Sequence, residues 1–181
     1  MDSKHHIRLP YKRKIIRQDL TSHCGGVALM LRSHYETSIQ SDMCCKSKTL
    51  EALTITLRSK QKLLISVVHR HPKPTSEDIN TLSELFHTMF ATGHQLYILG
   101  DLNCDLSNSN QNANAIKLTD CINQLQLSQL ISAPTRTTST SSICIDLIIT
   151  NAKKYVLSSG VIEYGPSDHD LVYAIIQTRL P

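Results

Sequence analysis

Two apolar runs that flank one helical pattern constrain the fold of this chain most. Residues 62–69 are almost continuously apolar, which is typical of a strand buried on both faces, and the two prolines that follow end it. Residues 75–78 then combine a hydroxyl cap with acidic side chains, as the start of a helix favours. The apolar positions that continue at helical spacing are Ile79, Leu82, Leu85, Phe86 and Met89. A second buried strand is predicted at residues 95–99.

Strand patterns outnumber helical patterns in the rest of the chain. Further strands are expected at residues 26–32, 50–57, 144–150 and 171–177, and a second helix at about residues 113–127. An excess of strands over helices favours an α/β fold with two packed sheets and outer helices over a simple doubly wound sheet. With 181 residues, the chain is long enough for one domain with a sizeable core.

The N-terminal residues 1–16 are basic and polar, and we expect them to be poorly ordered, with the folded domain at residues 17–181. They lack the apolar stretch of a secretory signal, and no apolar run in the chain is long enough to span a bilayer. These features predict an intracellular protein, nuclear or cytoplasmic, that is not secreted and has no membrane partner. The net charge of +4 is too small to indicate nucleic-acid binding by itself.

The six cysteines show no metal-binding pattern. There is no Cys-x-x-Cys pair, and no spacing of cysteine and histidine suits zinc. Since no signal peptide directs the chain to an oxidising compartment, we expect reduced and mostly buried thiols. The cysteines are Cys24, Cys44, Cys45, Cys104, Cys121 and Cys144.

Polar side chains at strand ends are the candidates for chemistry. Asp101 and Asn103 directly follow the strand at 95–99, and Asp168 and His169 lie in the loop before the last strand. A rigid sheet holds such residues in place, which is the usual architecture of α/β sites. Each pair also has a purely structural explanation, because Asp-x-Asn often forms an Asx turn and Asp-His can close a loop.

Asp146 is unusual because it lies inside an apolar strand, between Ile145 and Leu147. A carboxylate in such a place costs several kcal/mol unless it is paired or hydrogen-bonded (roughly 2–7 kcal/mol for an uncompensated polar group). His169 or Arg136 would be a suitable partner. Asp146 therefore predicts either a structural ion pair or part of a site.

The order and spacing of these motifs resemble the endonuclease/exonuclease/phosphatase superfamily, and most closely the apurinic-type endonuclease domain of LINE-type, non-LTR retrotransposons. The resemblance covers roughly residues 17–178. The segments that carry it are Gly-Gly-Val-Ala at 25–28, Val-Val-His-Arg-His-Pro at 67–72, Gly-Asp-Leu-Asn at 100–103, Pro-Thr-Arg at 134–136, Ile-Asp-Leu-Ile-Ile-Thr-Asn at 145–151 and Ser-Asp-His at 167–169.

This resemblance implies a fold and an activity. The fold would be a four-layered α/β sandwich, in which two packed mixed sheets are flanked by helices and the site lies at one end between the sheets. The activity would be a metal-dependent phosphodiesterase, a DNA endonuclease that uses Mg²⁺ or Mn²⁺, with DNA as its partner; the sequence indicates no protein partner. Oxygen ligands and a positioned water are what magnesium-dependent phosphodiester hydrolysis requires.

The resemblance also implies roles for individual residues. Asp101 would orient or deprotonate the attacking water, and Asp168 would help to hold the cation. Asp146 would orient His169, which would contact the phosphate. The remaining phosphate contacts implied are Asn103, Thr135 and His69.

Two departures from the family pattern bear on activity. The segments that carry the family's first Asn and its metal-binding Glu are not found here, so we expect a domain that is incomplete at its N-terminus, with an open sheet edge. Glu51 and the other glutamates stand outside that position, and His69 replaces the family's Tyr. The alternatives are therefore a catalytically inactive, truncated retrotransposon remnant that folds or binds nucleic acid without cleavage, and a phosphatase acting on phosphoinositides or small molecules.

Overall fold

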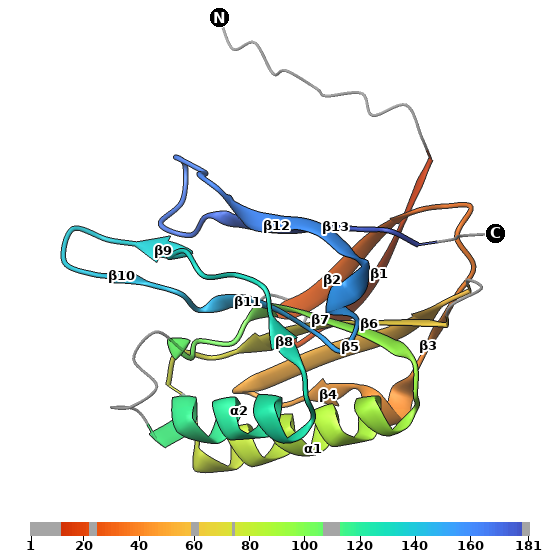
Figure 1. Ribbon diagram of the computed structural model, residues 1–181, viewed down its shortest axis with the longest axis horizontal. Helices are drawn as coiled ribbons and strands as arrows, with labels where there is room; N and C mark the ends of the chain where they lie inside the picture. Colours follow the sequence, from red (N-terminus) through yellow and green to blue (C-terminus); the bar gives the residue numbers. More distant parts are fainter. Residues whose placement is uncertain (1–11, 22–24, 59–61, 74, 107–112, 179–181) are drawn as a thin grey trace, which may run out of the picture.

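A seven-stranded mixed sheet forms the centre of the molecule. The computed structural model describes residues 12–21, 25–58, 62–73, 75–106 and 113–178 (Figure 1). Along the sheet, the strands are β3 (Thr37–Ile39), β5 (Leu50–Leu57), β6 (Leu63–Arg70), β7 (Gln95–Asp101), β11 (Asp146–Thr150) and β8 (Ser128–Gln129), and β4 (Cys45–Lys46) also pairs with β5. Strands β6 and β7 are parallel, since a helix connects them, and the other pairs are antiparallel.

Helices α1 (Ser76–Ala91) and α2 (Ala113–Gln124) cover one face of this sheet (Figure 1). Helix α1 begins with a capping box, in which the Thr75 hydroxyl accepts from the Asp78 N–H at 3.3 Å and the Asp78 carboxylate accepts from the Thr75 N–H at 2.6 Å. The predicted apolar stripe of α1 is buried against the strands. Neither helix, nor any other helix in the described ranges, has the length and hydrophobicity needed to cross a membrane.

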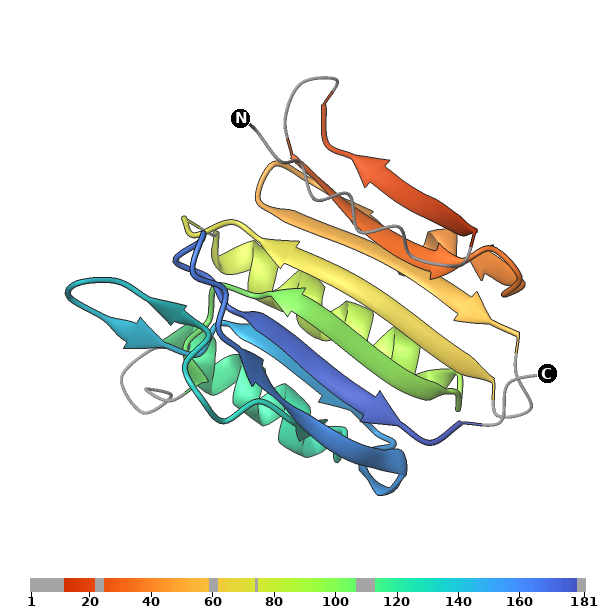
Figure 2. The ribbon, with the colours of Figure 1, turned by 90° about the horizontal axis from the view of Figure 1, so that it is seen from above.

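Two antiparallel ribbons lie on the other face of the sheet (Figure 2). One consists of β1 (Arg13–Asp19) and β2 (Gly26–Arg32), and the other of β12 (Val156–Ile162) and β13 (Leu171–Ile176). Each ribbon is formed by strands that are neighbours in sequence. Within the described residues, β2 and β13 each have a partner strand on one side only, so the ribbons do not join into one sheet.

The α/β class is therefore confirmed, but the four-layered sandwich differs from what is found. One full sheet and two separate ribbons stand where two sheets were predicted, and both helices pack on the same face of the full sheet. The apolar side chains that an outer helical layer would cover are exposed in the ribbons. They are Ile15, Met30, Leu157, Ile162, Leu171 and Ile175.

The ordered part of the N-terminus is longer than predicted. Residues 13–16, expected in a poorly ordered segment, form the first half of β1 and pair with β2. Alternate residues of β1 are half-buried, and the Lys14 ammonium donates to the Tyr35 carbonyl and to the Thr37 hydroxyl. A basic residue can thus be part of a strand when its charged group finds acceptors. Residues 1–11 lie outside the described residues, as do residues 22–24, which precede the Gly-Gly-Val-Ala segment.

The cysteines agree with the prediction of reduced thiols as far as they are described. Cys44, Cys45, Cys104, Cys121 and Cys144 are all free, and the last three are buried; Cys24 lies outside the described ranges. Burial raises the pKa of the Cys144 thiol to about 11. The Cys144 thiol also lies 3.4 Å from the Ile131 carbonyl, to which it donates.

Cys144 is expected to resist alkylation in the native protein. At pH 8, a thiol with a pKa near 11 has about 100-fold less thiolate than an ordinary cysteine, and the thiolate is the species that reacts. Iodoacetamide labelling followed by mass spectrometry should show Cys144 reacting about 100-fold more slowly in the native state than in urea. Equal rates in the two states would contradict its burial.

Candidate active site at one end of the sheet

Four ionisable side chains lie in one row at the end of the central sheet. Glu51 on β5 is the direct register partner of His69 on β6, His69 is the partner of Asp101 on β7, and Asp101 is the partner of Asp146 on β11. Side chains of directly opposed residues point to the same face. Their sequence neighbours Leu50, Ala52, Val68 and Leu147 belong to the core under the helices, so the row lies on the opposite face.

Asp146 and His169 form the first pair of the site. The Asp146 Oδ2 lies 3.0 Å from the His169 Nδ1, and their side chains are 15% and 31% exposed. An ionised carboxylate accepts hydrogen bonds and cannot donate them, so this contact places the imidazole proton on Nδ1 and leaves Nε2 available. The partner that the sequence required for a carboxylate in an apolar strand is therefore His169.

The loop that carries His169 is fastened to the segment around β9 (Arg136–Thr137), which pairs with β10 (Ser142–Ile143). The Thr137 N–H donates to the Asp168 carbonyl at 2.9 Å, and the Asp170 N–H donates to the Thr135 carbonyl at 2.7 Å. The Thr135 side chain is fully buried, and its hydroxyl accepts from the N–H groups of Ile145 and Asp146. Thr135 thus fixes the backbone of Asp146 relative to this loop.

Asp101 lies next to Asp146 in a half-buried position. Burial is the main reason that the pKa of Asp101 is raised, and the neighbouring Asp146 raises it further. The hydrogen bond from the Asn103 N–H opposes the shift most strongly, and His169 and His69 oppose it as well. The Asp101 Oδ1 accepts from the Asn103 N–H at 2.8 Å, which is the predicted Asx turn. This carboxylate is therefore held in place while its negative charge is incompletely compensated.

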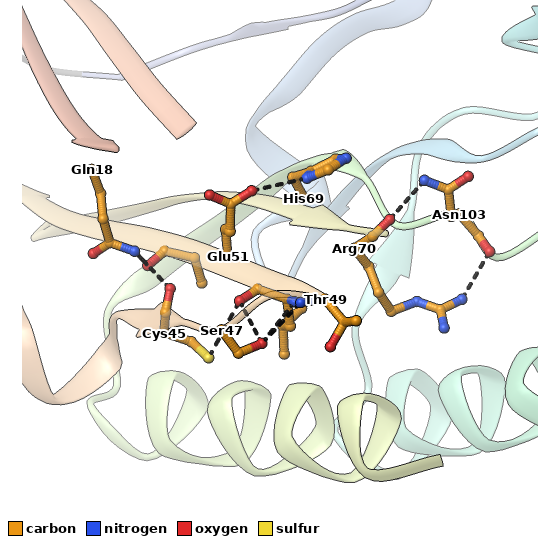
Figure 3. Close-up of polar contacts among 10 residues, drawn as sticks. Gln18, Cys45, Ser47, Thr49, Glu51, His69, Arg70 and Asn103 are labelled. Carbon is orange, nitrogen blue, oxygen red and sulfur yellow. Dashed lines mark hydrogen bonds and ion pairs between the residues drawn. The ribbon is translucent and has the colours of Figure 1, made fainter. Parts of the chain in front are cut away.

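A buried arginine fixes the turn after Asp101. Arg70 is 1% exposed, and its guanidinium donates to the carbonyls of Leu102 at 2.6 Å and Asn103 at 2.8 Å. The Asn103 side-chain amide donates in return to the Arg70 carbonyl at 2.6 Å, as Figure 3 shows. This reciprocal contact holds Asn103 at φ +44°, in the left-handed region that asparagine tolerates.

Glu51 and His69 form a second carboxylate–imidazole pair. The Glu51 Oε2 lies 3.1 Å from the His69 Nδ1; the Glu51 side chain is 4% exposed and that of His69 is 40% exposed. Figure 3 shows the other ring nitrogen of His69 pointing away from Glu51. In the row, His69 lies on one side of Asp101, and Asp146, which contacts His169, lies on the other side.

Asp101, Asp146 and His169 could hold a metal ion. Each offers one ligand atom, and these atoms lie within 4.8 Å of one another. Two carboxylates suit Mg²⁺ or Mn²⁺, which keep several waters and need few protein ligands. The raised pKa of Asp101 supports this fit, because a cation would offset the repulsion between the two acids.

The structure groups most of the predicted site residues. Asp101, Asp146 and His169 converge, with His69 beside Asp101 and Asn103 just beyond it. The expected metal ligand Asp168 lies outside that group. Its carboxylate is held 2.8 Å from the Arg136 Nε, which lowers the pKa of Asp168.

Glu51 and Arg70 were not singled out as functional from the sequence, although both contribute to the geometry of the site. The signal for Glu51 was an acidic residue in an otherwise apolar, alternating strand, the same signal that singled out Asp146. For Arg70 the signal was a charged residue at the end of a buried strand. Neither signal identifies the partner, because the partners are remote in sequence.

The class of fold follows from comparison with solved structures. The chain resembles the endonuclease domain of TRAS1, a telomere-specific non-LTR retrotransposon, at 14% identity and a TM-score of 0.72, over 93% of this chain and 79% of that one. It also resembles an endonuclease/exonuclease/phosphatase family protein from Leptotrichia buccalis, at 16% identity, a TM-score of 0.65 and coverages of 93% and 72%. A third structure that the chain resembles is the 3′ phosphatase NExo from Neisseria bound to product DNA hairpin. The identity is 13% and the TM-score is 0.64, over 91% of this chain and 79% of that one.

The family follows from the sequence match. Residues 62–173 match the endonuclease-reverse transcriptase family, which is more than half of the chain. The chain therefore belongs to this family, and the resemblance inferred from its motifs is confirmed. No curated protein matches the sequence. Because the sequence identities to these solved structures are 13–16%, the structures establish the shared fold and do not establish the activity.

Proposed function

We propose that the chain is a metal-dependent phosphodiesterase that cuts DNA in the manner of a retrotransposon endonuclease. The convergence of Asp101 with the Asp146–His169 pair carries this proposal, because three separate segments bring two carboxylates and an oriented imidazole within 4.8 Å of one another. The family match supports it, as do the names of two relatives, one an endonuclease domain and the other a phosphatase bound to product DNA.

The proposed reaction is hydrolysis of a phosphodiester by water. Asp101 orients the water and accepts one of its protons while the water oxygen forms a bond to phosphorus. The bond between phosphorus and the departing sugar oxygen breaks, and that oxygen takes up a proton from solvent. The Asp101 Oδ1 is held by the Asn103 N–H, which leaves Oδ2 to accept the proton.

The imidazoles and the Asn103 amide would hold the phosphate. His169 is oriented through its Nδ1 by Asp146, so its Nε2 can contact a phosphate oxygen. The Asn103 amide uses one N–H for the Arg70 carbonyl and retains a second for a phosphate oxygen. Thr135 would act through the backbone of Asp146, because its fully buried side chain has no exposed atom for the phosphate contact that the resemblance implies.

Asp101 and Asp146 are the residues that would hold Mg²⁺ or Mn²⁺, with Asp168 as the further ligand implied by the resemblance. The cation would neutralise charge on the phosphate. For Asp168 to take part, its carboxylate would have to exchange the Arg136 guanidinium for the cation. Both partners of this ion pair are exposed to solvent, so water can replace either of them during such an exchange.

The first test is nicking of supercoiled plasmid with Mg²⁺, with and without a chelator, by the wild type and by Asp146→Asn and His169→Ala. Both variants should lose about 10²-fold or more in rate, because they remove the oriented imidazole. His87→Ala, on an exposed position of α1, serves as the control and should leave the rate unchanged.

The outcomes separate the candidate functions. Chelator-sensitive nicking that is lost in both variants supports the proposal. A folded wild-type protein that binds DNA in an anisotropy titration but does not nick it would favour the non-catalytic alternative. Release of inorganic phosphate from phosphoinositides without nicking would favour the phosphatase.

A further inference from the structure

Glu51 is the most deeply buried acidic side chain in the row of Glu51, His69, Asp101 and Asp146. The residue is 3% exposed, its Oε2 contacts the His69 Nδ1 at 3.1 Å, and its Oε1 has no hydrogen-bond partner among the described residues. Two atoms of one carboxylate are thus removed from water in exchange for a single contact. Glu51 therefore costs the fold stability, as a buried carboxylate with few partners does.

Stability alone does not account for this residue. The rest of β5 that faces away from the helices is apolar, with Leu53 and Ile55 at 2% and 0% exposed. An apolar residue at position 51 would continue that pattern without burying a charge. The contact that Glu51 does make is with His69, so its effect on His69 is the feature to explain.

The effect of Glu51 is to fix the ring of His69. The ionised carboxylate can only accept, so the proton of the contact is on Nδ1 and the ring is oriented by that bond. Nε2 then points away from Glu51, as Figure 3 shows. On the other side of Asp101, Asp146 holds His169 through the same atom at 3.0 Å. The two pairs flank one central carboxylate.

We propose that Glu51 is a positioning residue, which holds His69 through Nδ1 so that Nε2 contacts the substrate phosphate on the side of Asp101 opposite to His169. The inference rests on the proposed function and adds to it a substrate contact that depends on this pair. A phosphodiester placed at Asp101 would be contacted by His69, which Glu51 orients, and by His169, which Asp146 orients. The need for Glu51 is tied to the imidazole, because a side chain without two ring nitrogens has no tautomer for the carboxylate to fix.

The dependence on an imidazole gives a direct test. Glu51→Gln keeps the shape of the side chain but removes its charge, and we expect kcat for plasmid nicking to fall at least about 10-fold in the wild-type background. A tyrosine hydroxyl has no tautomer to fix, so the same substitution in a His69→Tyr background should change kcat by less than about 2-fold. Glu84→Gln, exposed on α1, is the matched control and should have no effect.

A second readout does not depend on activity. Nitrogen-15 NMR of the histidine rings at pH 8, with His69 assigned from the His69→Tyr spectrum, should show an Nδ1–H tautomer for His69. Glu51→Gln should shift it toward Nε2–H, because an amide can donate to Nδ1. A wild-type Nε2–H tautomer overturns the proposal, as do equal losses of kcat in the two backgrounds.

The two readouts keep this inference separate from the proposed function. If no variant nicks DNA, the wild type included, the proposed function fails and the tautomer alone decides whether Glu51 positions His69. If the wild type nicks DNA and Glu51→Gln lowers kcat equally with His69 or Tyr at position 69, the function stands and Glu51 has only a structural effect.

Discussion

Gly100→Ala should destabilise the protein by about 3 kcal/mol or more, a large part of the 5–15 kcal/mol that holds a typical domain together. Gly100 has φ +141°, and a Cβ at this position would lie 1.9 Å from the Val68 carbonyl oxygen. Val68 is the register partner of Gly100 on the parallel strand β6, so the obstructing atom is backbone. Strain at this φ and overpacking each cost about 1–3 kcal/mol. Urea denaturation measures the loss.

Two other glycines provide graded controls for this prediction. Gly93 has φ +68° but open space around a Cβ, so Gly93→Ala should cost only about 1 kcal/mol of backbone strain. A Cβ at Gly165 would also meet open space, and Gly165→Ala should change the free energy of unfolding by less than about 0.5 kcal/mol. A Gly100→Ala protein as stable as Gly93→Ala would show that β6 and β7 can separate without cost.

The Gly100 contact also explains why the Gly-Asp-Leu-Asn segment works as a unit. The glycine allows β7 to lie close to β6, which places Asp101 beside His69. The turn that follows is held by Arg70 through two backbone carbonyls. A folded Gly100→Ala protein should therefore lose activity as well, because displacement of β7 moves Asp101.

The parts of the fold that were predicted correctly depend on local patterns. The capping box of Thr75 and Asp78, the apolar stripe of α1 and the strands on either side of it are all determined by residues close together in sequence. The strand at 13–16 was missed because basic residues mask the alternation of β1. The second sheet was predicted from the family, and the two ribbons that replace it follow from pairings within hairpins.

The site was predicted less completely because its contacts join distant segments. The sequence offered His169 or Arg136 as a partner for Asp146, and the resemblance gave Asp101 a role in the same site. The pairing of Glu51 with His69 depends on the register of β5 against β6, which the sequence does not reveal. The pairing of Arg136 with Asp168 depends on how two loops meet, and Asp168 lies outside the group of Asp101, Asp146 and His169.

Asp101→Asn should abolish nicking and at the same time stabilise the protein. Loss of a positioned base lowers the rate by about 10²–10⁴-fold. The pKa of Asp101 is raised in the folded state, chiefly by burial, so its ionised form at neutral pH opposes folding. An amide retains the shape and can still accept from the Asn103 N–H, so we expect a gain on the order of 1 kcal/mol in the free energy of unfolding, as for other site residues replaced for stability.

The pH dependence gives this gain a definite sign. A group whose folded pKa is raised contributes stability that is present below its unfolded pKa, near 3.8, and is lost as the pH rises through the folded pKa. The advantage of Asp101→Asn should therefore appear in thermal unfolding at pH 7 and vanish near pH 3.5. Asp168→Asn should behave in the opposite way, because Arg136 lowers the pKa of Asp168 and the charged form favours folding above the unfolded value. Asp101→Asn could instead prove less stable than the wild type at pH 7. That result would mean that contacts with its neighbours compensate the charge of the Asp101 carboxylate. The site would then have no need of a cation to offset that charge.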